Sequence, residues 1–83
     1  MPTVVREDGL IIRVYGPPRE HPPPHVHVEL GSDQLVVIRL ATRFSAPMVW
    51  AVYRMKRRDV VRAFRLVEKH HVAIESAWRK IHG

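Results

Sequence analysis

Hydrophobic and polar residues alternate along the first forty residues in the manner of β-strands. The runs rich in branched and aromatic residues cover residues 3–6, 10–15, 25–30 and 34–40. Asp8-Gly9, between the first two runs, is a tight hairpin signal. Gly31-Ser32-Asp33 is a turn sequence between the last two. The pattern predicts an antiparallel meander of about four strands.

From residue 57 onward the apolar period lengthens to that of a helix. Its apolar stripe, at alternating spacings of four and three, consists of Val60, Phe64, Val67, His71, Ile74, Trp78 and Ile81. A straight helix over 57–82 would be about 39 Å long, whereas a compact chain of this size is only about 30 Å across. We therefore expect a kink or break within 69–71.

The segment 41–55 follows neither period. Pro47 interrupts any continuing pattern, and residues 48–55 fit an edge strand, a short helix or a loop that presses Trp50 onto the sheet. We interpret 41–55 as an irregular connector.

These elements predict a single α+β domain over residues 1–83. A β-sheet part, 1–40, packs against a helical part, 56–83, made of one helix or a kinked helix pair. The large aromatic side chains Trp50, Phe64 and Trp78 are expected in the core.

The net charge of the chain indicates which kind of ligand it could bind. Fourteen Lys and Arg residues against eight acids give a net charge of +6, and eleven of the fourteen are Arg. The Arg side chain suits bidentate contact with phosphate or carboxylate. Nucleic acid or an acidic partner protein is therefore a plausible ligand, although a basic surface can also serve only to keep a small domain in solution.

Other features of the composition narrow the classes of protein. The 83 residues include no cysteine, so a disulfide framework and a thiolate metal site are excluded, which is compatible with the cytoplasm. The apolar runs are short and the start lacks the pattern of a signal peptide, so we expect a cytoplasmic protein with no membrane partner. A chain of this length has a small core, which leaves a homodimer open.

Candidate chemistry is concentrated between Glu20 and Gly31, a segment that holds three of the six histidines. On a strand, His25, His27 and Glu29 point to one face and the intervening apolar residues to the other. Three prolines upstream form a stiff, extended lead-in that holds His21 near the start of the strand.

The histidine block admits three interpretations. His25 and His27 can both reach one ion, and with His21 and Glu29 they form a candidate site for zinc, nickel or iron. Without a metal, His25 and His27 could act as general base and general acid in RNA cleavage through the 2′-hydroxyl. The third interpretation is structural, with the imidazoles bonded to loop backbone and to one another.

The helical part offers a separate candidate site. Arg58, Arg62, Arg65 and Lys69 recur at spacings of four, three and four, well away from the apolar stripe. Such a row can follow phosphates, and four contacts would give a log-log salt slope of about −3 to −4. The alternative is an ordinary solvated helix face.

Four segments of the chain together resemble the DUF4160 family of small, mostly bacterial proteins. They are M-P-T-V-V-R-E-D-G at the start, E-H-P-P-P-H-V-H-V-E, R-R-D-V-V-R-A, and W-R-K-I-H-G at the close. The resemblance implies a gene often found beside one of the DUF2442 family, in an arrangement of toxin-antitoxin type, and hence a cognate protein partner. It supplies no catalytic residues. Whether such a protein would be an enzyme stays open.

Overall fold

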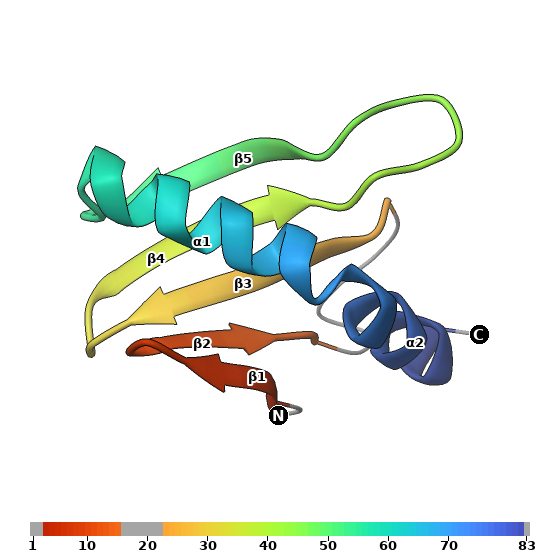
Figure 1. Ribbon diagram of the computed structural model, residues 1–83, viewed down its shortest axis with the longest axis horizontal. Coiled ribbons are helices and arrows are strands. Elements are labelled where there is room, and N and C mark those ends of the chain that lie inside the picture. The colour runs from red at the N-terminus through yellow and green to blue at the C-terminus, as the bar shows by residue number, and fades with distance from the viewer. Residues whose placement is uncertain (1–2, 16–22, 83) are drawn as a thin grey trace.

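The computed structural model describes residues 3–15 and 23–82, and over these residues it contains five strands and two helices. They are β1 (Thr3–Glu7), β2 (Leu10–Arg13), β3 (His25–Leu30), β4 (Gln34–Arg39), β5 (Met48–Tyr53), α1 (Arg57–Lys69) and α2 (His71–His82). Each strand pairs antiparallel with the next, so the order across the sheet is β1-β2-β3-β4-β5. The expected α+β fold is confirmed, with one strand more than the pattern predicted (Figure 1).

The two predicted turns are present. Glu7 pairs with Leu10, so Asp8 and Gly9 form a two-residue hairpin loop with φ values of 52° and 80°. Positive φ at both central positions is the geometry that Asp-Gly favours, because its twist matches that of the flanking strands. Gly31, in the β3–β4 turn, has φ of 65°. Local chemistry was sufficient to predict both connections.

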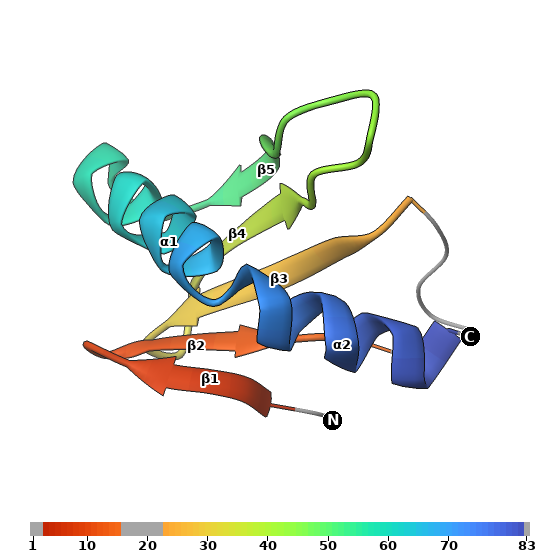
Figure 2. The same cartoon turned by 45° about the vertical axis from the view of Figure 1, so that its right-hand side comes forward.

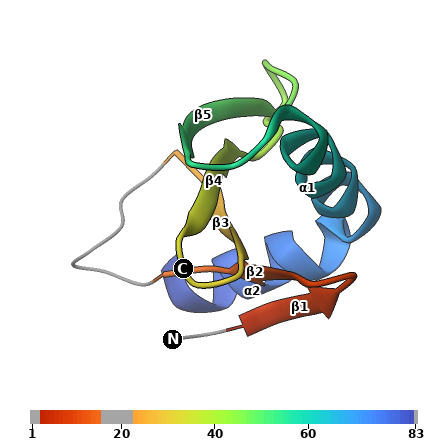
Figure 3. The same ribbon diagram turned by 90° about the vertical axis from the view of Figure 1, so that its left-hand side faces the viewer.

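The helices lie on one side of a curved sheet (Figures 1 and 3). Val26 and Val28 of β3 point to this side and have no exposed surface, which confirms the predicted strand register. The buried core consists of Leu10, Ile12, Val14, Val26, Val28, Val36, Ile38, Leu40, Met55, Ala63, Leu66, Val67, Ile74 and Trp78. Within the described ranges, neither helix is long and apolar enough to cross a membrane.

The expected break in the helical part lies at His70. Its φ of −107° and ψ of 23° end α1, and α2 begins at the next residue. The break lets α2 run alongside β1 and β2 toward the far end of the sheet (Figure 2). His71, the first residue of α2, lies at this break and is exposed, although the apolar stripe placed it toward the core.

Most of the predicted apolar stripe faces the sheet. Val67, Ile74 and Trp78 are buried, whereas Val60 and Phe64 are half-buried and pack against the core.

The structure corrects the expectation for 41–55, because residues 48–53 form the edge strand β5. The expectation that Trp50 lies in the core is also wrong, since 45% of its surface is exposed. A β-bulge adds Trp50 to β5 between the pairs Val37–Ala51 and Ile38–Val49. The bulge disturbs the period of two that identifies a strand in sequence.

Candidate functional site

β3 places His25, His27 and Glu29 on the face of the sheet away from α1, but it buries the first of them. His25 is only 6% exposed, and its ring centroid lies 5.3 Å from that of Trp50 and 5.6 Å from that of Trp78. The Nδ1 atom of His25 donates a hydrogen bond of 2.9 Å to the carbonyl of Pro23. This contact fixes the orientation of the ring and, because a carbonyl only accepts, places a proton on Nδ1.

His27 is half-buried and belongs to a polar group that spans β3 and β2. The Tyr15 ring meets the His27 ring edge-on, with centroids 4.7 Å apart. The Tyr15 hydroxyl donates to Oε2 of Glu29 at 3.3 Å, and Nε of Arg13 lies 3.1 Å from the same oxygen. Glu29 is therefore oriented by a phenol and a guanidinium. A hollow of about 370 Å³ next to this group reaches the β3–β4 turn and Tyr53.

Of the four predicted metal ligands, three lie within the described residues. His21 lies outside the described residues, and the ring centroids of His25 and His27 are 5.7 Å apart. Within 3–15 and 23–82, no three His, Asp or Glu side chains are grouped so that they could hold a metal ion. The four-residue site, and acid-base catalysis by His25 and His27, stay predictions.

The predicted basic row on α1 divides into two kinds of residue. Arg62 donates from Nη1 to Oδ1 of Asp59 at 2.7 Å and from Nη2 to the carbonyl of Asp8 at 2.6 Å. Lys69 donates from Nζ to Oε2 of Glu7 at 2.7 Å. Both side chains therefore attach α1 to the β1–β2 hairpin, a role that spacing along one helix could not indicate.

Glu7 receives a second contact from the helical part, because Nε2 of His70 lies 3.0 Å from its Oε1. The ammonium of Lys69, and then the His70 ring, hold the pKa of Glu7 below its ordinary value. The Glu7 carboxylate in turn raises the pKa of Lys69. The paired charges favour the ionised form of each group.

Arg58 and Arg65 form the other half of the row. Both are exposed, and neither has a hydrogen bond or ion pair with any described residue. They lie two helical turns apart, so their side chains emerge from the same side of α1. The structure thus leaves these two guanidinium groups available to a ligand.

The predicted start of the helical part at residue 57 is confirmed, but the sequence interpretation did not include Lys56 and Arg57 in the basic row. Lys56 is the N-cap residue and provides no side-chain hydrogen bond to the helix, and Arg57 directly precedes Arg58. All three side chains are exposed. The consecutive Lys-Arg-Arg run was the available signal. We define the α1 basic surface as Lys56, Arg57, Arg58 and Arg65.

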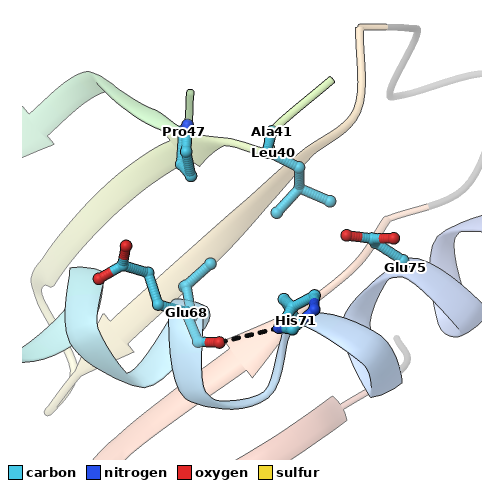
Figure 4. A pocket seen from close by; sticks show the side chains of 7 residues that line it. Leu40, Ala41, Pro47, Glu68, His71 and Glu75 are labelled. Carbon is cyan, nitrogen blue, oxygen red and sulfur yellow. Dashed lines mark hydrogen bonds between the residues drawn. The ribbon is translucent and has the colours of Figure 1, made fainter. Parts of the chain in front are cut away.

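A second hollow, of about 230 Å³, lies between the α1–α2 junction and the loop that follows β4 (Figure 4). Leu40 and Pro47 supply apolar walls, and Glu68 and Glu75 stand at its rim. His71 donates from Nδ1 to the carbonyl of Glu68 at 3.1 Å. The exposed position of His71 beside this hollow results from the helix break.

Comparison with known proteins identifies the family without an activity. The family model described as a domain of unknown function, DUF4160, matches residues 9–79. No curated protein and no solved structure matches the chain.

Proposed function

The chain belongs to the DUF4160 family, and we propose, from the geometry of its own surface, that it binds nucleic acid through the α1 basic surface. The observation that supports this proposal is the exposure of Arg58 and Arg65 without an acidic partner among the described residues. Exposed Arg side chains on one helix face are suited to the phosphates of a nucleic acid backbone.

The position of the cations along α1 adds to the argument. Lys56, Arg57 and Arg58 lie at the N-terminal end of the helix, where the helix dipole is positive. Acidic residues are favoured there, and each misplaced cation costs roughly 0.3–1 kcal/mol. A phosphate bound at this end would offset that repulsion through the same side chains and the first backbone amides.

Asp59 does not neutralise the α1 basic surface. It is the acidic residue of the first turn, but its buried carboxylate is bonded to Arg62. Arg54 is in a looser ion pair with Asp33, at 3.7 Å, with both side chains largely exposed. The net positive charge at this end of the molecule is thus available to attract an anionic polymer.

Contacts of this kind are made to the backbone and carry little sequence information. We therefore expect binding that depends strongly on salt and weakly on sequence. The family resemblance supports a role for this binding in a two-gene bacterial module of toxin-antitoxin type, with a cognate protein as a further partner.

The test compares two double variants with the same change in charge. Arg58→Gln with Arg65→Gln alters the α1 basic surface, and Arg79→Gln with Lys80→Gln alters exposed cations at the end of α2. Binding to a labelled DNA duplex and a labelled RNA is measured by fluorescence anisotropy across a salt series. The α1 variant should bind more weakly to every sequence, with a log-log salt slope shallower by about 2.

The α2 variant is the control for charge alone and should retain the wild-type slope within about half a unit. Equal weakening by both variants would show that net charge, and not the α1 basic surface, determines binding. Absence of binding by the wild type to DNA and to RNA at low salt would refute the proposed function.

A further inference from the structure

β5 is an edge strand without the charged or proline residues that usually protect an edge, although it carries a bulge at Trp50. Over the described residues it pairs with β4 alone. Its six residues, Met48–Tyr53, contain no charged side chain and no proline. Natural sheets normally place charges, prolines or a covering element on such an edge, because its free N–H and C=O groups can pair with another chain.

Apolar side chains of β5 are exposed on both faces of the sheet. Val49 and Val52 pair with the buried Ile38 and Val36, so they point to the helix side, yet they are 36% and 46% exposed. On the other face, Met48, Trp50 and Tyr53 are 45%, 45% and 55% exposed. The helices thus leave this edge of the sheet uncovered.

We propose that a second copy of this chain pairs antiparallel along β5 and extends the sheet across a two-fold axis. In the register centred between Trp50 and Ala51, Met48 lies opposite Tyr53 of the second copy and Val49 lies opposite Val52. Every facing pair is apolar, and each contact occurs twice, as a two-fold interface requires. The bulge at Trp50 lies beside the axis, so the added twist falls at the same place in both copies.

The same register keeps the positive charges of the two copies apart. The exposed Arg54, which directly follows β5, lies opposite Pro47 of the second copy. The two Arg54 side chains are then separated by seven strand positions, about 24 Å at 3.4 Å per residue. This exceeds the Debye length of about 8 Å at physiological salt, so their repulsion is largely screened.

A second copy fits this edge better than nucleic acid does. The strand presents apolar side chains and backbone groups, whereas the cations that suit phosphate lie on α1 and beyond the ends of β5. Strand pairing of this kind obtains affinity from main-chain hydrogen bonds and specificity from the apolar side chains. The dimer therefore does not depend on the proposed nucleic-acid binding.

Sedimentation velocity on the full chain tests the proposal. The measurement is made in high salt, so that any bound nucleic acid dissociates. Over about a hundredfold range of concentration, the weight-average mass of the wild type should rise from 9.7 kDa toward twice that value. Val52→Lys, which places a charge at the interface, should weaken association by roughly tenfold or more. Val72→Lys is the matched control, because Val72 is 69% exposed on α2, and it should associate like the wild type.

Amide hydrogen exchange on the wild type gives a second measurement that needs no variant. As concentration rises, the outward amides of β5 should become protected, while those of the other edge strand, β1, should not change. A monomer at every concentration would overturn the proposal. The alternative occupant of the β5 edge would then be a strand from a different protein. A dimer that persists in Val52→Lys, or that forms without protection of β5, would also overturn it.

Discussion

β1 and β5 lie at opposite edges of the same sheet, and the helical part attaches to the first while leaving the second exposed. Glu7 at the end of β1 is bonded to Lys69 and His70, and the carbonyl of Asp8 accepts a hydrogen bond from Arg62. α2 also runs beside β1 (Figure 2). No ion pair of the described chain involves a residue of β5.

This difference between the two edges shows that two short helices can cover one edge of a five-stranded sheet and leave the other exposed. The β1 edge carries the charged residues Arg6 and Glu7, whereas β5 carries none. A charged edge resists pairing with another chain, and an apolar edge invites it. The two helices cover the sheet from β1 to β4 and leave apolar side chains of β5 exposed.

The largest loss of stability is expected when Trp78 is replaced, and a much smaller loss when Trp50 is replaced. Trp78, on the helix that covers the β1 side, is 7% exposed and contacts His25 and His82, whereas Trp50 on β5 is 45% exposed. Trp78→Ala should lower the free energy of unfolding by about 3–5 kcal/mol, because it leaves a cavity. Trp50→Ala should cost about 1 kcal/mol. Urea unfolding at low protein concentration measures both, and equal losses would contradict the contrast between the edges.

A smaller effect is expected from the contact between α1 and the β1–β2 hairpin. Arg62→Gln leaves the buried carboxylate of Asp59 without its cation and removes the bond to Asp8, so it should cost about 1–3 kcal/mol. Arg65→Gln, three residues along the same helix, is the control and should stay within about 0.5 kcal/mol of the wild type. Thermal unfolding measures both variants. A similar loss in both would mean that Arg62 does not anchor the hairpin.

The smallest expected effect is the dependence of the β1 anchor on pH. Because the native pKa of Glu7 is lowered, its contribution to stability is present above its ordinary value of 4.5 and is lost as pH falls through the native pKa. Glu7→Gln should therefore lower the melting temperature at neutral pH, and the difference from the wild type should vanish on acidification.

Glu75→Gln is the control for this pH experiment. Glu75 is half-buried and forms no ion pair with a described residue, so its variant should follow the wild-type curve. A difference between Glu7→Gln and wild type that persists unchanged into acid would show that the Glu7 side chain stabilises the fold by packing and not by charge.

Local patterns in the sequence predicted the local features of this fold. Asp8-Gly9 specified the hairpin, the alternation around Val26 and Val28 specified the register of β3, and chain length against helix length specified the break at His70. Each depends on residues close together in the chain, where turn geometry and side-chain period act directly.

Features that depend on distant residues were not predictable in the same way. The burial of His25 results from Trp78, more than fifty residues later, and the pairing of Lys69 with Glu7 joins the two ends of the chain. The exposure of Trp50 follows from its position at a bulge of the edge strand, on the face of the sheet away from α1. No period within one element encodes such contacts, and the division of the basic row into anchoring and available cations was therefore invisible in the sequence.

The anchoring of β1 by the helical part has a consequence for the order in which the chain can fold. The bond between Glu7 and Lys69 closes a loop of 62 residues, for which the entropic cost is about 4 kcal/mol. During synthesis the β1–β2 hairpin leaves the ribosome first, long before its helical partners exist. Until α1 and α2 follow, both edges of the nascent sheet are open, and only completion of the C-terminal helices distinguishes the protected edge from the one that remains available for pairing.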